Sequence, residues 1–301
     1  MDRFRITSHE STESSSDEMW TVGSILTWIE GYLAHHGDAH ARLSAQWLVS
    51  DALHMSRIAL YADLDRPLTL EERAQLREET KRRATGEPLQ YITGTTDFRF
   101  NTIQVQPGVL IPRPETEVLV SEAFEDVTEP HIVVDIGTGT GCIACSVATE
   151  YPDSHVYATD IDPHAVEIAQ RNARMLGVDD RLNVIEGDLG EGIPSEVEGM
   201  CDLVISNPPY IPTAVLADLD EEVTAHEPRL ALDGGDDGLD VLRRLIPAAL
   251  ILLKPGGVLA VELYETTLDQ AATLARQAGM DHVRIACDLT HRPRVLIAHR
   301  A

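Results

Sequence analysis

The stretch of this 301-residue chain that decides its fold reads Ile132-Val133-Val134-Asp135-Ile136-Gly137-Thr138-Gly139-Thr140-Gly141. Its first half is an apolar run interrupted once, by Asp135, which predicts a buried strand. The three glycines at alternate positions allow the backbone to turn sharply into a helix over 141–150. A strand that enters a helix through a glycine turn is typical of an α/β domain built on a parallel sheet.

From residue 98 onward the chain continues this alternation of strands and helices. We expect strands over 155–160, 181–186, 203–206 and 258–263, helices over 115–124, 163–176, 239–253 and 266–278, a closing antiparallel pair over 283–288 and 295–298, and an upstream hairpin over 98–100 and 103–105. Together these segments predict an α/β fold in which helices cover both faces of a seven-stranded Rossmann-like sheet.

The region before this sheet divides into parts by composition. Residues 1–18 are rich in Ser, Glu and Asp, which predicts a disordered acidic tail. Residues 19–86 carry apolar side chains at helical spacing, which predicts a helical domain, a small bundle of four short helices. Residues 87–114 are punctuated by Gly and Pro and are expected to form a hairpin connector. The sheet domain then covers residues 115–301.

The charge of the chain is unusual. Fifty Asp and Glu stand against 24 Lys and Arg, which leaves a formal net charge of -26, and only two of the cations are lysines. General affinity for nucleic acid needs clustered cations, so we expect no direct nucleic-acid partner, although a local basic pocket is compatible with this balance. The acidity favours a cytoplasm of high ionic strength, in which self-repulsion is screened.

The apolar segments and the cysteines bear on the compartment. The longest apolar stretches, such as 245–253, are shorter than the ~20 residues that a bilayer requires, and the first residues lack the apolar core of a signal peptide. Cys142 and Cys145 are spaced like a redox pair, but no second pair or His cluster completes a metal site. We expect a cytoplasmic monomer with neither a membrane partner nor a bound metal.

The spacing of the glycine turn indicates a class of cofactor. A dinucleotide fold uses G-x-G-x-x-G, whereas the third glycine here comes one residue early, which disfavours a dehydrogenase. Asp135 is expected to place a carboxylate beside the ligand, which suits a cationic, phosphate-free cofactor such as S-adenosylmethionine. The turn residues expected to hold it are Gly137, Thr138, Gly139, Thr140 and Gly141. The alternative is a glycine-rich connection that binds no ligand.

Three further residues follow strands that end at the same edge of the predicted sheet. Asp160 ends the second strand, where a carboxylate can accept hydrogen bonds from both ribose hydroxyls. Asp188 and Leu189 follow the third strand, and we expect the first to accept from an adenine amino group and the second to lie against the ring. A solvated loop carboxylate is the alternative for Asp188.

The sequence Asn207-Pro208-Pro209-Tyr210, after the fourth strand, predicts a clamp for a planar amino group. Prolines have no N–H, so this turn exposes carbonyl acceptors. The Asn207 side-chain carbonyl and the Pro208 carbonyl can accept the two N–H bonds of one NH2 group, while Tyr210 can stack on a planar substrate. Two acceptors raise the electron density of a delocalised nitrogen, align it for in-line methyl transfer and stabilise the positive charge that the transfer creates. A plain proline turn is the alternative.

Further stretches, together with the glycine turn and the proline turn, resemble one enzyme family. They are Glu87-Pro88-Leu89-Gln90-Tyr91-Ile92-x-Gly94, Leu110-Ile111-Pro112-Arg113-Pro114-Glu115-Thr116-Glu117, Glu227-Pro228-x-x-Ala231-Leu232, and Asp288-Leu289 with Arg292-Pro293-Arg294. On these motifs the chain, over residues 19–300, resembles the HemK/PrmC family of peptide chain release factor N5-glutamine methyltransferases.

This resemblance implies a class I methyltransferase sheet with a small N-terminal helical bundle. It implies transfer of a methyl group from S-adenosylmethionine to the glutamine amide in the Gly-Gly-Gln loop of class I release factors, its protein partners. It assigns the cofactor to Gly137 to Gly141, Asp160, Leu189 and Asn207, and the glutamine amide to Asn207, Pro208, Pro209 and Tyr210. Phe100 and Arg113 are expected to border the glutamine pocket. Some members carry Trp where Leu189 stands, so adenine stacking is expected to be weaker here.

Several alternatives stay open at this point. Arg113 could instead anchor the connector to a carboxylate such as Glu117, and Glu262 is expected to be structural. A nucleic-acid N6-adenine methyltransferase shares the clamp, but it would need a basic surface or a target-recognition domain. A ribosomal-protein glutamine methyltransferase is barely separated by these motifs. An intact clamp beside an intact glycine turn argues against a non-catalytic scaffold.

Overall fold

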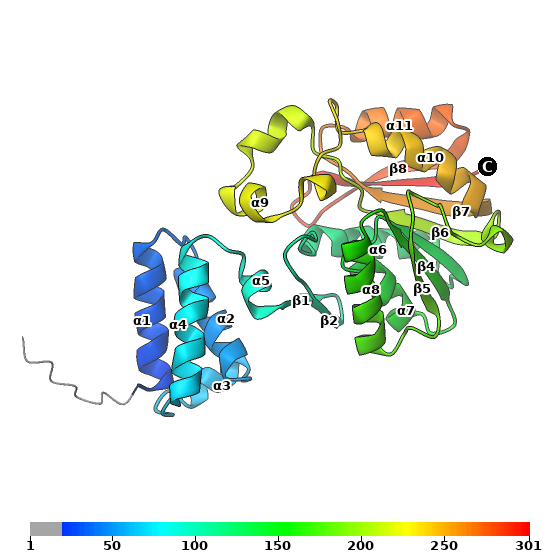
Figure 1. Cartoon of the computed structure of the whole chain (residues 1–301). Helices are drawn as coiled ribbons and strands as arrows, with labels where there is room; N and C mark the ends of the chain where they lie inside the picture. Colours follow the sequence, from blue (N-terminus) through cyan, green and yellow to red (C-terminus); the bar gives the residue numbers. More distant parts are fainter. Residues whose placement is uncertain (1–19) are drawn as a thin grey trace, which may run out of the picture. The chain divides into compact units, whose positions relative to one another are not determined.

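The structure, a computed structural model, describes residues 20–301 in two compact units (Figure 1). One unit ends at Thr85, and the other comprises Gly86–Ala301. The acidic tail expected over 1–18 lies outside the described residues. Within 20–301 no helix has the length and apolar character needed to cross a membrane.

The unit that ends at Thr85 is helical. Its helices are α1 (Val22–His35), α2 (Ala41–Ala52), α3 (Arg57–Ala62) and α4 (Leu70–Ala84). Thr21 and Thr69 begin α1 and α4 with capping boxes, in which the threonine hydroxyl accepts from the backbone N–H three residues later. Leu33, Leu48 and Leu76 form part of the buried interior. The predicted helical bundle is confirmed.

A short helix and a hairpin open the second unit. They are α5 (Leu89–Thr93), β1 (Thr95–Phe98) and β2 (Asn101–Gln104). The hairpin is present, but the prediction of a strand over 98–100 was wrong. Phe98 pairs with Asn101, so Arg99, at a φ of 53°, and Phe100 form a two-residue turn. Phe98 is consequently buried, while Phe100 is 81% exposed.

Seven strands form the main sheet, in the order β5-β4-β3-β6-β7-β9-β8. They are β3 (Ile132–Ile136), β4 (His155–Asp160), β5 (Leu182–Glu186), β6 (Cys201–Ser206), β7 (Leu253–Glu262), β8 (Met280–Cys287) and β9 (Pro293–Arg300). The first five in this order are parallel, and β9 runs antiparallel to both of its neighbours. The predicted seven-stranded Rossmann-like sheet and its closing antiparallel pair are confirmed.

Helices cover both faces of this sheet (Figure 1). They are α6 (Pro114–Asp126), α7 (Cys142–Glu150) and α8 (Pro163–Leu176) on one face, and α10 (Asp240–Leu252) and α11 (Leu268–Gln277) on the other. Alternate residues of each strand point to opposite faces. Val133 therefore belongs to the core under α6 and α7, and Val134 to the core under α10 and α11.

Two features differ from the prediction. The segment between β6 and α10 contains η2 (Thr213–Asp218), α9 (Glu221–His226) and η3 (Arg229–Ala231), which were not predicted. None of them buries a residue, so they leave no hydrophobic periodicity in the sequence. In addition, β7 begins at Leu253 rather than Val258, because Leu253 pairs with Cys201 before the register shifts.

Gly141 lets α8 approach the start of α7 closely. It has a φ of 78°, and a Cβ built on it would lie 2.9 Å from the Ala169 Cβ. Real Cβ atoms do not approach that closely, and the left-handed backbone also disfavours a side chain. Position 141 therefore requires glycine for two separate reasons.

Gly141→Ala is expected to lower the free energy of unfolding by about 2–4 kcal/mol, the sum of backbone strain and overpacking. Gly256→Ala is the matched control, because Gly256 has a φ of 76° but open space around its Cβ position. It should lose only the strain contribution, about 1 kcal/mol. Urea denaturation of both variants measures the difference, and equal losses would show that the contact with Ala169 does not matter.

Candidate functional site

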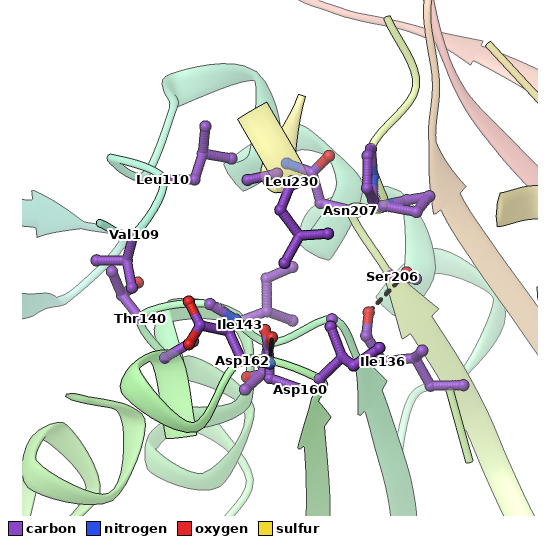
Figure 2. A pocket seen from close by; sticks show the side chains of 18 of the residues that line it. Val109, Leu110, Ile136, Thr140, Ile143, Asp160, Asp162, Ser206, Asn207 and Leu230 are labelled. Atoms are coloured by element: carbon purple, nitrogen blue, oxygen red, sulfur yellow. Dashed lines mark hydrogen bonds between the residues drawn. The ribbon is translucent and has the colours of Figure 1, made fainter. Parts of the chain in front are cut away.

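A pocket opens at the carboxyl ends of the central strands (Figure 2). Its polar lining comes from the glycine turn, from Asp160 at the end of β4, Asp188 after β5 and Asn207 after β6. Its apolar lining includes Val109, Leu110, Ile136, Ile143, Ala165, Leu189, Leu230 and Val241. Figure 2 shows Asp160 and Asn207 on different sides of one cavity. The structure thus brings together residues that lie far apart in the sequence.

The glycine turn presents bare backbone to this pocket. Gly137 and Gly139 have φ angles of 72° and 56°, and no heavy atom lies within 4 Å of the position a Cβ would take. The N–H groups of Gly137 and Thr138 donate to the Thr159 carbonyl, at 2.8 and 2.9 Å, which ties the turn to β4. A ligand can approach the main chain at these glycines without meeting a side chain.

Asp160 is held rigidly at the pocket wall. Its Oδ2 accepts the Gly139 N–H at 2.8 Å, and its Oδ1 accepts the Asp162 N–H at 3.0 Å. Burial raises the pKa of this carboxyl, and the backbone hydrogen bonds oppose that rise. A carboxylate has about four acceptor positions, so Asp160 can accept two further hydrogen bonds, such as those of a vicinal diol.

Asp135 lies behind the turn rather than in the pocket lining, where the sequence predicted it. It is fully buried, and its Oδ2 accepts from the Thr138 hydroxyl at 2.6 Å and the Ala144 N–H at 3.2 Å. Its Oδ1 has no hydrogen-bond partner. Burial raises the pKa of Asp135 to about 7. The carboxyl therefore shapes the turn, and one of its oxygens is left without compensation.

Asp188 is paired, which the sequence did not predict. Its Oδ2 accepts from Arg244 Nη2 of α10 at 2.5 Å, and both residues line the pocket. The neighbouring Leu189 has a φ of 55°, and its carbonyl accepts from the Thr159 hydroxyl at 2.6 Å. The pair brings a cation into a pocket whose other charged lining is mostly acidic. No local sequence pattern indicated Arg244 as the partner of Asp188, because 56 residues separate the two.

A buried hydrogen-bond network supports Asn207. Its Nδ2 donates to Thr116 Oγ1 of α6 at 3.0 Å, and this hydroxyl donates to Glu262 Oε2, at the end of β7, at 2.8 Å. The Tyr210 hydroxyl donates to Glu262 Oε1 at 2.9 Å. Asn207 and Thr116 line the pocket together with Pro208 and Pro209. Because its NH2 group is engaged by Thr116, the side-chain oxygen of Asn207 is left as an acceptor.

Tyr210 takes a different place from the one predicted. It is not among the lining residues, and its ring packs against the core under α10 and α11. Burial, followed by the neighbouring Glu262, raises the pKa of its hydroxyl. The ring therefore does not lie in the pocket, where the sequence predicted that it would stack on a planar substrate.

Arg113 anchors the connector to the loop after α9. Its guanidinium pairs with the buried Glu227 carboxylate, so the anchoring to a carboxylate that the alternative described is present, although the partner is Glu227 and not Glu117. Burial raises the pKa of Glu227, and Arg113 opposes that rise. Arg113 also lines the pocket. The same side chain therefore both anchors the connector and borders the pocket.

The prediction that Phe100 borders the pocket was wrong. Phe100 is at the tip of the hairpin turn and is not among the lining residues. The preceding Arg99 pairs with Glu150 at the far end of α7, whose first residue, Cys142, is at the pocket. Phe100 is therefore placed at the end of α7 opposite the pocket, because the two-residue turn points it into solvent.

The geometry gives the cysteines at the start of α7 no catalytic role. Cys142 and Cys145 are buried, and burial raises the pKa of the Cys142 thiol to about 12. A thiol with a raised pKa is a poor nucleophile. Over residues 20–301 no group of His, Cys, Asp and Glu is arranged to hold a metal ion.

Comparison with protein families assigns both units. Residues 24–94 match the PrmC N-terminal domain, and residues 114–226 match the methyltransferase small domain. The first match covers most of the helical unit and continues through α5, and the second covers the chain from α6 to α9, while residues 95–113 between them are matched by neither.

Individual relatives agree with these families. The chain is 48% identical over 246 residues to the release factor glutamine methyltransferase of Geobacter sulfurreducens, covering 82% of this chain and 85% of that protein. It is 42% identical over 272 residues to the release factor glutamine methyltransferase of Moorella thermoacetica, covering 89% and 94%. Among solved structures, the hMettl16 catalytic domain in complex with a 3'UTR hairpin matches with a TM-score of 0.54 at 17% identity, covering 75% of this chain and 81% of that chain. That likeness concerns the fold alone and agrees with the class I methyltransferase sheet.

Asp135→Asn is expected to change how stability depends on pH. The folded chain raises the pKa of Asp135 from 3.8 to about 7. Between these values the folded state holds a proton that the unfolded state has released, so this group lowers stability by about 1.4 kcal/mol for each unit of rising pH. The variant lacks this dependence. Its free energy of unfolding relative to the unchanged chain should therefore rise between about pH 4 and pH 7, as urea denaturation would show. A constant difference would contradict the raised pKa.

Proposed function

The chain belongs to the family of release factor glutamine methyltransferases, and from that premise we propose that it methylates the glutamine amide in the Gly-Gly-Gln loop of class I peptide chain release factors. S-Adenosylmethionine is the proposed methyl donor. The observation that carries the proposal is the engagement of the Asn207 NH2 group by Thr116, at 3.0 Å, which leaves the Asn207 oxygen to accept from a substrate amide.

The pocket residues fit the proposed donor. Two open glycines provide a close approach to the backbone, and Asp160 has spare acceptor positions for a ribose diol. Asp188 remains the proposed acceptor for the adenine amino group through the oxygen that Arg244 does not engage. Leu189 provides an apolar surface for the ring. When bound, S-adenosylmethionine supplies an activated methyl group on a sulfonium.

The residues of the chain then have to align and polarise a poor nucleophile. An amide nitrogen shares its lone pair with the carbonyl, so it attacks carbon badly. Asn207 Oδ1 and the Pro208 carbonyl oxygen, accepting its two N–H bonds, hold it in one direction and raise its electron density. Positive charge develops on nitrogen during the transfer, so the same two acceptors bind the transition state more strongly than the ground state.

A protein glutamine suits the chain better than a nucleobase. Fifty acidic against 24 basic residues give a net charge of -26, which repels phosphate backbones. We also propose that the enzyme acts in the cytoplasm, as a monomer, on release factors and not on nucleic acid. A glutamine of a ribosomal protein offers the same amide and is the competing substrate.

Transfer from labelled S-adenosylmethionine to purified proteins tests the substrate. Label is expected on a class I release factor and should be absent when its Gly-Gly-Gln glutamine is replaced by alanine, because that change removes the acceptor nitrogen. Ribosomal proteins and nucleic acid are the parallel acceptors. Label that persists on the replaced factor, or that appears only on one of the other acceptors, would overturn the proposal.

Asn207→Ala and Asp160→Ala are expected to separate catalysis from cofactor binding. The first removes an acceptor of the substrate amide, so turnover should fall at least about 100-fold while cofactor affinity is largely spared. The second removes the proposed ribose acceptor and should weaken cofactor binding by about 10-fold or more. Calorimetry measures the affinity, and labelled transfer measures the turnover.

Asp153→Ala provides the control for these variants. Asp153 is an exposed aspartate in the turn before β4, away from the pocket lining. It should leave both quantities unchanged. Full turnover in Asn207→Ala would refute the clamp, and unchanged affinity in Asp160→Ala would refute the assignment of the cofactor site.

A further inference from the structure

Glu262 is an unusual residue for the end of a buried strand. The residue is 1% exposed, and its carboxyl group accepts one hydrogen bond from Thr116 and one from Tyr210. A buried carboxylate costs free energy unless it is compensated. Two segments that are distant from it in the sequence, α6 and the proline turn, donate to it, which indicates a role beyond packing.

The direction of each hydrogen bond in this network follows from the chemistry of the groups. An ionised Glu262 has only acceptors, so the single hydroxyl hydrogen of Thr116 is committed to it. Thr116 Oγ1 can then only accept from the third member, Asn207. Only the NH2 end of the Asn207 amide can donate, so this end faces Thr116 and the carbonyl end faces the pocket.

We propose that Glu262 is a positioning residue that, through Thr116, holds the Asn207 amide with its oxygen toward the substrate nitrogen. This inference rests on the proposed function, since it assigns to Asn207 the task of accepting from the glutamine amide. Glu262 touches neither the pocket nor any reacting atom, and it acts only by fixing which end of Asn207 faces each way.

Protonation of Glu262 would reverse the donor and acceptor roles in the hydrogen bonds that link Glu262, Thr116 and Asn207. A protonated carboxyl can donate to Thr116, which frees the Thr116 hydrogen to point at Asn207. The amide then gains by turning its oxygen to Thr116 and its NH2 group to the pocket. Two NH2 groups would face each other there, and the substrate amide would lose an acceptor.

The surroundings of Glu262 set the pH at which this happens. Burial raises its pKa, and the bonds from Thr116 and Tyr210 lower it. Arg294 of β9 also lowers the pKa, and Glu115 of α6 raises it. The Cys142 thiol, whose pKa is itself raised, stays neutral near neutral pH. The loss of activity in acid is therefore expected above the range of an ordinary carboxyl group.

A threonine series tests the link to Asn207. Thr116→Val removes the hydroxyl and should lower kcat on the release factor by about 10-fold. Cofactor affinity should stay unchanged. Thr116→Ser restores the hydroxyl and should restore most of kcat. Thr80→Val is the matched control, because Thr80 is equally buried but bonds only to the Leu76 carbonyl in the helical unit. The proposed positioning of Asn207 through Thr116 would be overturned if Thr116→Val had the same kcat as the unchanged chain. It would also be overturned if Thr116→Ser did not recover kcat.

The pH profile of Glu262→Gln tests the role of the carboxylate. Gln has nearly the same shape but no titrating group, so the fall of kcat in acid that Glu262 causes should disappear. A merely structural Glu262 would leave the shape of the profile unchanged while lowering kcat. An identical acid limb in both proteins would therefore contradict the proposal.

NMR of the Asn207 side-chain amide tests the hydrogen-bond link from Glu262 to Asn207 without an activity measurement. The signal is assigned by its loss in Asn207→Ala. In the unchanged chain it should shift with pH, and in Glu262→Gln this shift should be absent. The positioning role of Glu262 would be overturned if the signal did not shift with pH in the unchanged chain, or if it shifted equally in the unchanged chain and in Glu262→Gln. An unchanged chain that methylates no release factor but shows this titration would contradict the proposed function and leave the positioning role supported.

Discussion

The parallel pairing of β3 with β4 on one side and with β6 on the other is the constraint on which the site depends. Ile136 is in register with Thr159 of β4 and with Ser206 of β6. Because all three strands run the same way, the residues that follow them emerge at one edge of the sheet. The glycine turn, Asp160 and Asn207 are neighbours for this reason. The parallel pairing of β7 with β6 adds the end of a further strand, where Glu262 is found.

Buried carboxyl groups at this edge lower stability in return for a defined arrangement of polar groups. Asp135 and Glu262 are almost completely removed from water, and burial raises the pKa of both. Each accepts a hydrogen bond from a threonine hydroxyl, Thr138 for Asp135 and Thr116 for Glu262, although Asp135 Oδ1 has no partner. Natural proteins retain such costly groups mainly where a site needs them. The glycine turn and the Asn207 amide are the two parts that these carboxyl groups hold in place.

Much of the fold and part of the site could be predicted from local sequence. The apolar run of 132–136, the glycines after it and the proline turn at 207–210 are short patterns whose geometry depends on adjacent residues. The partners of Asn207 and Asp188 could not be found in this way. Thr116 and Arg244 reach them across the tertiary fold, and a single Thr or Arg on a helix has no distinguishing signal. Phe100 was misplaced because the turn places Arg99 at a φ of 53°, a left-handed conformation that residues other than glycine rarely adopt and that no local pattern indicated.

The acceptors of the proline turn are proposed to hold a glutamine amide in line with the methyl donor. A crystal structure of the chain with S-adenosylhomocysteine and a Gly-Gly-Gln peptide tests this most directly. The glutamine nitrogen should lie about 3 Å from both the Asn207 side-chain oxygen and the Pro208 carbonyl oxygen, with the Asn207 nitrogen still on Thr116. A glutamine side chain bound elsewhere, or an Asn207 amide turned with its nitrogen toward the peptide, would contradict the claim.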